Sequence, residues 1–280
     1  MARVFIAGAG YVGSVAARLL REAGHVADIG RRKASVEAGS HAMDVLRPAT
    51  YPAALGEAEC VVYCVSADAF TEESYRDAYV HGLGSVIAAA AKGRARRLVF
   101  VSSTGVFGQD DGSVVDESSP AIPKGFSGRA LLEGEALLAG SGLEATAIRF
   151  SGIYGPGRDR LVRMVRSGSP VSAKSRAAIT NRIHRDDCAR ALLHLVERPA
   201  VQPLYLGTDE APTPMGEILD WIAGRLGLPS PPVGEDNAQV LQRGGNKRLS
   251  SARLRGEGFR FLYPTYREGF EAILAAEAAP

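Results

Sequence analysis

The stretch RVFIAGAGYVGS, from Arg3 to Ser14, decides the fold of this chain. It begins as a short apolar run typical of a buried parallel strand, and three glycines then follow in the pattern G-x-G-x-x-G. Apolar residues next recur at steps of three and four as far as Ala23, which predicts an amphipathic helix ended by Gly24. A strand, a glycine turn and a helix in this order predict a dinucleotide-binding unit.

The glycine turn is the expected pyrophosphate site. The first glycine of such a turn permits its tight bend, the second lets the backbone approach the pyrophosphate, and the third lets the helix pack against the strand. The helix start adds amides and the positive end of the helix dipole. The cofactor residues expected here are Gly8, Gly10, Tyr11, Val12 and Gly13.

Strand and helix patterns alternate along the first 155 residues, which predicts an α/β fold with a doubly wound parallel sheet. Further strands are expected at 25–31, 41–46, 60–67, 96–103 and 144–154, and helices at 74–91 and 127–139. We therefore expect a Rossmann domain over residues 1–155, with its sheet completed by segments within 179–210.

The chain changes character after Tyr154, where a Gly-Pro-Gly turn is followed by frequent proline and glycine. Helices are expected at 158–166, 186–197, 215–226 and 266–276. We expect residues 156–280 to form mostly a small C-terminal substrate lobe, too irregular to own a hydrophobic core.

Composition narrows the possible partners. The chain has 46% hydrophobic and 23% charged residues, which is typical of a globular protein. Its net charge is +2 and its basic residues are scattered along the chain, so the charge does not favour binding to nucleic acid or to a membrane surface. We expect a small-molecule substrate. No apolar run approaches the roughly 18 residues of a membrane span, and no signal peptide is expected, so the predicted location is the cytoplasm.

The three cysteines do not suggest a disulfide or a metal site. Cys60 and Cys64 lie on one predicted strand with α-carbons about 13 Å apart, too far to bridge. Together with Cys188 they are typical of buried thiols in a reducing compartment. No metal site is predicted.

The end of the second strand indicates which cofactor binds. Many dinucleotide-binding units carry an acid there that binds the ribose 2′-hydroxyl, but this chain has Gly30 followed by Arg31 and Arg32. A glycine leaves space, and a guanidinium group can bind a 2′-phosphate through two hydrogen bonds, so NADP(H) is favoured and NAD is the less favoured alternative. A solvated basic turn also fits these residues, and Asp28, two residues earlier, would favour NAD.

Further motifs follow the later strands. They are CVSA at 64–67, FVSSTGVFG at 100–108, RFSGIYGPGR at 149–158 and NRIHRDDCARAL at 181–192. With the glycine motif, they resemble the extended, or atypical, short-chain dehydrogenase/reductase family of NAD(P)-dependent epimerases and dehydratases, over nearly the whole chain.

The resemblance implies roles for several residues. Asp44 would bind the adenine amino group beside Val45, and Val65 and Ser66 would line the passing cofactor. Ser103 would take the catalytic Ser/Thr position with Thr104 beside it, and the family also implies a homodimer through the helices at 74–91 and 127–139.

The stretch FSGRALLEGE, residues 126–135, departs from the family pattern. It sets Ser127 and Leu131 where the family carries Tyr-x-x-x-Lys, and no lysine of this chain has a tyrosine four residues before it. A phenol with a pKa near 10 needs a neighbouring ammonium to transfer protons at neutral pH, so we expect atypical proton transfer.

Other polar residues are candidates, each with a structural alternative. Tyr154 could face the nicotinamide or pack the turn after it, and His184 could move protons or hold the helix start near Asp186. Lys124 could reach inward or remain solvated. The tract from Arg243 to Arg248 could hold an anionic substrate or be a solvated basic loop.

These residues favour an NADP(H)-dependent oxidoreductase or epimerase acting at a hydroxyl or ketone carbon of a small metabolite, with Ser103 aligning the oxygen. Two alternatives stay open. One is a non-catalytic NADP(H)-binding sensor or scaffold, and the other is a nucleotide-sugar epimerase whose diphosphate would need a site such as the Arg243 to Arg248 tract.

Overall fold

The structure is a computed structural model that describes residues 1–235 and 245–278. The chain divides into two compact units, each built from three separate stretches. The N-terminal unit comprises Met1–Phe107, Ala121–Phe150 and Cys188–Tyr205, and the C-terminal unit comprises Gly108–Pro120, Ser151–Asp187 and Leu206–Pro280.

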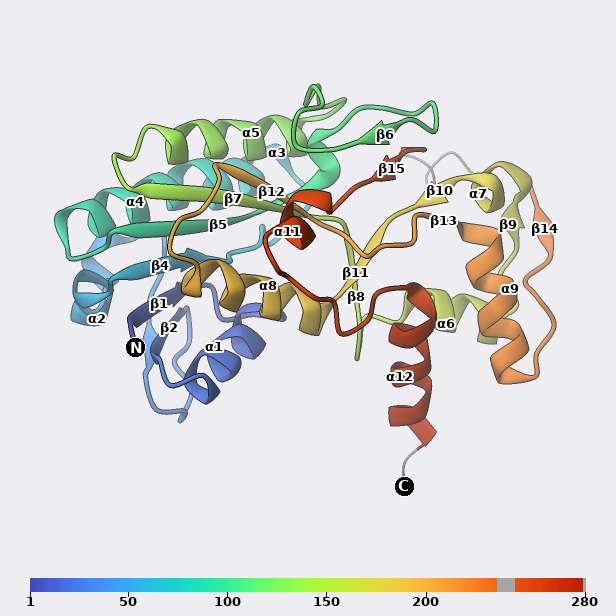
Figure 1. The fold of residues 1–280 in the computed structure, drawn as a ribbon, viewed down its shortest axis with the longest axis horizontal. Coiled ribbons are helices and arrows are strands. Elements are labelled where there is room, and N and C mark those ends of the chain that lie inside the picture. Colours follow the sequence, from blue (N-terminus) through green and yellow to red (C-terminus); the bar gives the residue numbers. More distant parts are fainter. Residues whose placement is uncertain (236–244, 279–280) are drawn as a thin grey trace. The chain divides into compact units, whose positions relative to one another are not determined.

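A seven-stranded sheet in the order β12-β7-β5-β4-β1-β2-β3 forms the centre of the N-terminal unit (Figure 1). Its strands are β1 Arg3–Ala7, β2 Val26–Arg31, β3 Ser40–Ala42, β4 Cys60–Tyr63, β5 Arg97–Ser103, β7 Glu144–Phe150 and β12 Leu204–Gly207. The strands from β3 to β7 pair in parallel, with Val4 opposite Ala27 on one side and Cys60 on the other. The predicted doubly wound parallel sheet is confirmed.

Helices cover both faces of this sheet (Figure 1). One face carries α3 Glu72–Arg76, α4 Leu83–Lys92 and α5 Phe126–Ala139, and the other carries α1 Gly13–Glu22 and α8 Arg185–Glu197; α2 spans Ala53–Glu57. The single helix predicted over 74–91 is interrupted by a π-helical segment, Asp77–Gly82. There the Tyr63 hydroxyl donates to the Ala78 carbonyl at 2.5 Å, and a Cβ on Gly82 would lie 2.8 Å from the same hydroxyl. This close approach requires glycine.

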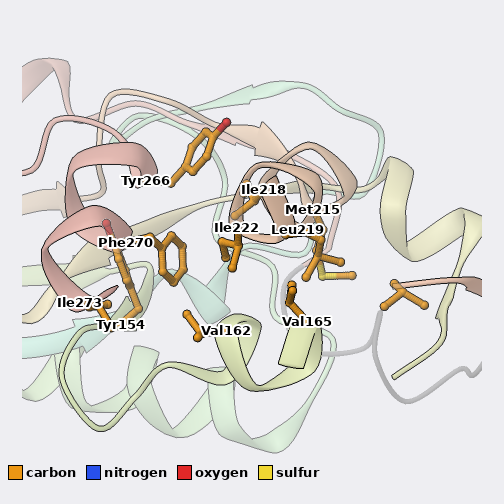
Figure 2. Packing of buried hydrophobic residues seen from close by; sticks show 12 residues of the cluster. Tyr154, Val162, Val165, Met215, Ile218, Leu219, Ile222, Tyr266, Phe270 and Ile273 are labelled. Carbon is orange, nitrogen blue, oxygen red and sulfur yellow. The ribbon is translucent and has the colours of Figure 1, made fainter. Parts of the chain in front are cut away.

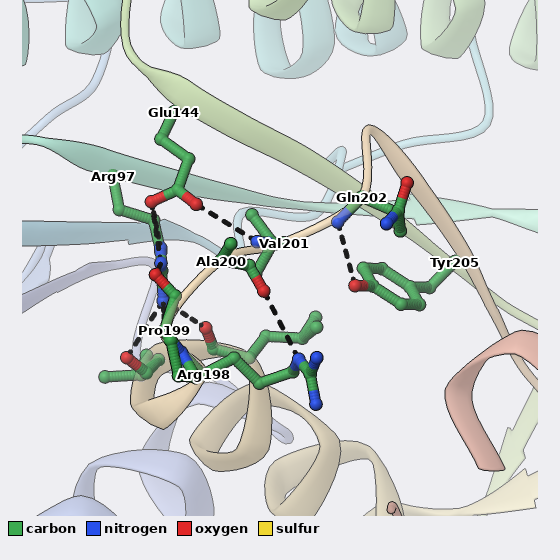
Figure 3. Close-up of polar contacts among 10 residues, drawn as sticks. Arg97, Glu144, Arg198, Pro199, Ala200, Val201, Gln202 and Tyr205 are labelled. Carbon is green, nitrogen blue, oxygen red and sulfur yellow. Dashed lines mark hydrogen bonds and ion pairs between the residues drawn. The ribbon is translucent and has the colours of Figure 1, made fainter. Parts of the chain in front are cut away.

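A buried arginine fixes the end of α8 to the sheet (Figure 3). Arg97, at the start of β5, is 8% exposed, and its Nη1 donates to the carbonyls of Leu195 at 2.9 Å and Arg198 at 2.6 Å. Its Nη2 also binds Glu144 Oε2 at 2.6 Å, and Glu144 Oε1 accepts from the Val201 amide at 3.0 Å. The guanidinium thus satisfies carbonyls that a helix end leaves without partners.

The C-terminal unit consists of short strand pairs and helices. The pairs are β8 Gly152–Tyr154 with β11 Arg182–His184, β6 Val114–Val115 with β15 Arg248–Leu249, β9 Val171–Ser172 with β14 Val233–Gly234, and β10 Ile179–Thr180 with β13 Thr213–Pro214. Its helices are α6 Arg160–Arg166, α7 Ala173–Ala177, α9 Met215–Leu226, α11 Ala252–Gly256 and α12 Tyr266–Ala278. The strand predicted over 144–154 is divided at Ser151, because β8 leaves the main sheet to pair with β11.

This unit has a hydrophobic core, so the expectation that the region lacks one is wrong. Buried residues of three helices meet, among them Val162 of α6, Ile218 and Ile222 of α9, and Phe270 of α12 (Figure 2). The loops rich in proline and glycine separate these helices along the chain, but each helix supplies one apolar face to a shared cluster. Among the described residues, no helix combines the length and hydropathy needed to cross a membrane.

Candidate functional site

Most of the predicted site residues lie along the edge of the parallel sheet that is formed by the carboxyl ends of its strands. The strands that follow β1 along the chain, β2 and β3, lie on one side of it in the sheet, whereas β4 and β5 lie on the other side. In sheets of this kind, ligands bind at the carboxyl ends of the strands where the strand order reverses, here between β1 and β4. The predicted residues that follow or end β1 to β5 are Gly8, Gly10, Tyr11, Val12, Gly13, Arg31, Arg32, Asp44, Val45, Val65, Ser66, Ser103 and Thr104. Tyr154 belongs to the C-terminal unit.

The glycine turn after β1 is packed too closely for side chains at two positions. Gly8 has φ +96°, and a Cβ there would lie 2.6 Å from the Cys64 carbonyl carbon. A Cβ on Gly13 would overlap the Gly8 carbonyl oxygen. These two glycines therefore bring the turn against the end of β4 and the start of α1 against the turn.

Gly10 differs, because a Cβ at this position would meet nothing within 4 Å. The protein's own packing therefore does not require glycine here, whereas a pyrophosphate approaching the backbone would. Helix α1 begins just beyond, and no side chain caps its start at Val12. The turn and the helix start thus fit the diphosphate of a dinucleotide.

Gly30, near the end of β2, is glycine for a different reason than the sequence suggested. A Cβ there would lie 2.7 Å from Met43 Sδ and 2.9 Å from Phe5 Cζ, so any side chain at this position would require Met43 and Phe5 to shift. The Gly30 carbonyl accepts from the amides of Gly8 at 2.9 Å and Ala9 at 3.3 Å. The strand end therefore supports the glycine turn and has no carboxylate of its own.

The charged residues around Gly30 have distinct environments. Asp28 pairs with His41 Nε2 at 3.1 Å, so its carboxylate is already engaged. Arg31 is exposed, and its side chain has no hydrogen bond or ion pair among the described residues. Arg32 binds Asp68 through two hydrogen bonds of 2.6 and 2.7 Å, which raise the pKa of Arg32 above its ordinary value. Arg31 is thus the guanidinium open to a phosphate.

The residues after β3 and β4 form two further loops at this edge. Asp44 Oδ1 accepts from the Leu46 amide at 3.0 Å, so the carboxylate stabilises its own turn. The Val45 carbonyl accepts from the Tyr51 hydroxyl at 2.6 Å. Val65 is partly buried beside Gly8, and Ser66 is exposed. No feature of these four residues by itself identifies an adenine or ribose contact.

Ser103 and Thr104 end β5 with different surroundings. Ser103 is partly exposed, and its Oγ accepts from the Gly105 amide at 3.1 Å, which fixes the oxygen and leaves the hydroxyl proton to be donated. Thr104 is buried, and its hydroxyl donates to the Phe150 carbonyl at 3.4 Å. Ser103 can therefore meet a substrate oxygen, while Thr104 joins β5 to β7.

The first turn of α5 lies against the loop that follows Ser103. A Cβ on Gly128 would lie 3.0 Å from the Gly105 carbonyl oxygen. Ser127 is partly exposed in this turn, whereas Leu131, one turn further along, is only 4% exposed and belongs to the core. Burial raises the pKa of Tyr51 and Tyr79 to about 12, so neither of these two tyrosines is prepared to lose its proton near neutral pH.

A buried ionic network beneath this edge was missed by the sequence analysis. Glu135 of α5 accepts from the Ser102 hydroxyl at 2.6 Å and from Arg149 Nε at 2.9 Å, and its other oxygen binds Arg149 Nη2 at 2.6 Å. Arg149 also lies 4.8 Å over the Phe107 ring. An arginine in the apolar run AIRF was the available signal, since a buried charge needs a partner.

Tyr154 lies in the core of the C-terminal unit (Figure 2). It packs 4.8 Å from the Phe270 ring and 5.3 Å from the His184 ring, and its buried hydroxyl has no hydrogen-bond partner in the part of the chain that the structure describes. Burial raises the pKa of Tyr154 well above its ordinary value. Tyr154 is therefore a packed side chain of this core, and its contacts are with Phe270 and His184.

His184 and the helix start beside it have structural contacts. The His184 Nδ1 accepts from the Asp186 amide at 3.2 Å, and burial lowers the pKa of His184 to about 4. Asp187 accepts from the consecutive amides of Leu262 at 2.7 Å and Tyr263 at 2.9 Å. The DD pair thus fastens the segment before α12 within its unit.

Arg182 and Asp209 are two buried charged residues that the sequence analysis did not identify. Both are at most 6% exposed, and the Asp209 amide donates to the Arg182 carbonyl at 2.7 Å. Burial raises the pKa of Asp209 to about 7, an effect that the nearby Arg182 charge opposes. The tract from Arg243 to Arg248 lies partly outside the described residues; within them, Arg248 donates to the Gly112 carbonyl at 2.5 Å.

The sequence matches the family described as the RmlD substrate binding domain over residues 2–277. The chain belongs to this family. It is thus a member of the extended short-chain dehydrogenase/reductase group of NAD(P)-dependent epimerases and dehydratases. The resemblance found in the motifs is confirmed at this level.

Individual relatives add detail. A solved structure described as an NAD-dependent epimerase/dehydratase from Methylobacillus flagellatus is 38% identical, with a TM-score of 0.81 and 99% of each chain covered. A short-chain dehydrogenase/reductase from Agrobacterium tumefaciens, solved with bound NAD, shares the fold at 18% identity and a TM-score of 0.82, covering 98% of this chain and 96% of that one.

Two curated relatives match over part of their length. The 3-diazoavenalumate denitrifying reductase of a Streptomyces species is 32% identical over 54% of this chain and 53% of its own. Protein YeeZ of Escherichia coli K12 is 28% identical over 66% of this chain and 65% of its own. The matched region thus spans less than two thirds of either relative.

Proposed function

We propose that this protein is an NADP(H)-dependent oxidoreductase or epimerase that acts at a hydroxyl or ketone carbon of a small metabolite. The observation that carries the proposal is the combination of residues at the glycine turn and at the end of β2. Gly10 leaves its backbone open, Gly30 places no acid at the end of β2, and the exposed Arg31 guanidinium has no partner among the described residues.

The glycine turn and the two arginines would hold NADP(H). The turn and the uncapped start of α1 offer backbone amides to the diphosphate, and Arg31 offers two parallel hydrogen bonds to the 2′-phosphate. When bound, the nicotinamide supplies the group that accepts or donates hydride. The protein's contribution is to position the substrate oxygen and to provide for its proton.

Ser103 is the residue proposed to orient the reacting oxygen. The Gly105 amide holds its Oγ, so the oxygen is fixed and its hydroxyl proton can be donated to the substrate oxygen. A hydrogen bond to a developing oxyanion is stronger in the transition state than in the ground state, and this difference raises the rate.

The proton itself needs another source. Ser127 has no comparable acidity, Leu131 is apolar and buried, and burial keeps Tyr51 and Tyr79 protonated. We therefore propose that the substrate exchanges its proton with water or with a group that the substrate brings to the site.

The relatives favour a redox reaction. The name of the Streptomyces relative describes a reductase, and that of the Methylobacillus structure describes an epimerase/dehydratase with NAD. Our proposal of NADP(H) in place of NAD rests on Gly30, Arg31 and Arg32 alone. Steady-state oxidation of NADPH against a panel of ketones and aldehydes tests it, with NADH as the matched cofactor, and equal use of both cofactors would refute the preference.

A non-catalytic NADP(H)-binding protein is the second candidate, favoured by one observation. Leu131 is built into the core at the position where a charged residue would act on the cofactor ribose. Tight NADPH binding by calorimetry, with no hydride transfer in single-turnover experiments across the same panel, would select this candidate. Binding of a UDP-sugar in the same calorimeter would instead favour a nucleotide-sugar epimerase.

We further propose a homodimer formed through the helices α4 and α5, in a reducing compartment such as the cytoplasm. Leu137 of α5 is 39% exposed and lies on one of these two helices, so it is a suitable position to test the interface. All three cysteines are free thiols. Light scattering of the wild type and of Leu137→Glu tests the dimer, since the substitution should produce monomers. The proposal includes neither nucleic-acid nor membrane binding.

A further inference from the structure

The ion pair between Arg32 and Asp68 crosses the candidate cofactor site. Arg32 directly follows β2 and Asp68 lies in the loop after β4, and β1 lies between these two strands in the sheet. The pair therefore passes over the carboxyl end of β1, where the glycine turn begins. Both side chains are exposed, at 68% and 64%, so solvent and ligands can reach them.

Asp68 is held in position by its own loop. The Ser74 hydroxyl oxygen, in α3, accepts from the amides of Asp68 at 3.0 Å and Ala69 at 3.1 Å. The carboxylate then meets Arg32 with both oxygens, the arrangement that a phosphate would use on the same guanidinium. A fixed carboxylate needs little further ordering to form this pair.

We propose that Asp68 is a specificity-determining residue that competes with the cofactor's 2′-phosphate for Arg32. The inference rests on the proposed NADP(H) site. Binding of the 2′-phosphate replaces the carboxylate on Arg32 and brings a second anion close to Asp68. Asp68 therefore weakens the preference for NADP(H) that Arg31 and Arg32 create, and has no such effect on NAD(H), which lacks this phosphate.

The magnitude follows from the exposure of the pair. An exposed ion pair changes an equilibrium constant by roughly 1.4- to fivefold, and repulsion between unit charges about 4 Å apart in water changes it by about fivefold. Removing the carboxylate relieves both effects and should therefore tighten a ligand that carries a 2′-phosphate about eight- to thirtyfold.

The test compares adenosine 2′,5′-bisphosphate with 5′-AMP by calorimetry, because the two probes differ only in the 2′-phosphate and require no enzymatic activity. Asp68→Asn should tighten the bisphosphate about eight- to thirtyfold and change 5′-AMP less than twofold. Glu73→Gln removes the same charge from an exposed residue of α3 that does not contact Arg32, and it should change neither probe. Circular dichroism of each variant checks the fold.

A double-variant cycle makes the test specific to the pair. Asp68→Asn should have a smaller effect on the bisphosphate in an Arg32→Ala background, because the contested guanidinium is gone and only the repulsion between Asp68 and the phosphate remains. The inference is overturned if Asp68→Asn leaves the bisphosphate unchanged or weakens it, or if Glu73→Gln has an equal effect.

The two proposals fail in different ways. A wild-type protein that prefers the bisphosphate, with no change in Asp68→Asn, would refute only the role of Asp68. A preference that appears only in Asp68→Asn would support that role and refute NADP(H) selectivity of the wild type. No binding of either probe by any variant would refute both.

Discussion

Gly13 lies so close to Gly8 that a Cβ on Gly13 would overlap the Gly8 carbonyl oxygen. Gly10, between them, has no neighbour within 4 Å of its Cβ position. We expect Gly13→Ala to destabilise the protein by roughly 1 to 3 kcal/mol, as overpacking does. Gly10→Ala should keep the wild-type melting temperature and lose NADPH affinity, because the methyl group meets only the ligand. Thermal unfolding and calorimetry separate the two, and equal losses of stability would contradict the assignment.

Cofactor preference should depend more on Arg31 than on Arg32, since Arg32 is already paired with Asp68. NADPH should bind more tightly than NADH, and a charge-assisted contact of about 1.5 to 3 kcal/mol corresponds to about ten- to a hundredfold. Arg31→Ala should remove most of this ratio, and Arg32→Ala a smaller part. Dissociation constants for both cofactors, measured on each variant, check the order; an unchanged ratio in Arg31→Ala would rule it out.

Ser103→Ala should reduce turnover by roughly a hundredfold, the usual effect of losing one hydrogen bond to a developing oxyanion. Ser127→Ala should keep most of the activity, because this hydroxyl has no group that would activate it. NADPH affinity should be nearly unchanged in both variants, which separates a chemical effect from a binding effect. Single-turnover rates are the measurement. Loss of turnover in Ser127→Ala would show that the serine is activated by a neighbour not recognised here.

Glu135→Leu should destabilise the N-terminal unit by about 3 to 5 kcal/mol, because it leaves the Arg149 guanidinium buried without its carboxylate. The double variant Glu135→Leu with Arg149→Met should recover part of this loss, since two apolar groups replace a complete ion pair. Urea unfolding of the wild type, each single variant and the double variant measures the coupling. Additive effects of the two single substitutions would show that the pair contributes nothing.

Asp209 should make stability depend on pH. Burial raises its pKa to about 7, above the ordinary value of an unfolded aspartate, so the folded state holds an extra proton between these values. Stability should therefore fall as pH rises from about 4 to about 7 and then level off. Asp209→Asn removes this slope, so its stability relative to the wild type should increase across the window.

The measurement must compare the free energies of unfolding of Asp209→Asn and of the wild type at each pH. The lowered pKa of His184, about 4, gives the opposite slope between pH 4 and 6.5, because its unfolded form binds the extra proton there. His184 contributes equally to both proteins and cancels. A difference that does not change with pH would contradict the buried, protonated Asp209.

Local signals in the sequence predicted the nucleotide-binding half well. The glycine turn and the continuous apolar strands have short-range causes, so the sheet and α1 followed from patterns alone. The reason for glycine at position 30 was not predicted correctly. The sequence suggested that Gly30 leaves room for a phosphate, but side chains of Met43 and Phe5, from other parts of the chain, lie where its Cβ would be. A contact between distant segments is invisible to periodicity.

The C-terminal unit shows the same limit more strongly. Helix α9 was predicted with its observed bounds, Met215–Leu226, because its apolar spacing is local. Its packing against residues such as Val162 and Phe270 joins helices far apart in the chain, so the shared core was missed. Likewise, Glu135 and Arg149 each look like an ordinary charge until the fold places them in contact. The catalytic assignments of Ser103, Thr104 and Tyr154 stay predictions.

The clamp that Arg97 forms on the end of α8 has a consequence for synthesis on the ribosome. Its acceptors, from Leu195 to Pro199, are made about a hundred residues after Arg97 itself, and they belong to the last stretch of the N-terminal unit. A nascent chain that ends before them exposes a sheet whose buried arginine lacks these carbonyls. We therefore expect the nucleotide-binding half to complete its folding only once residue 205 has left the exit tunnel, by which time much of the other half has already been translated.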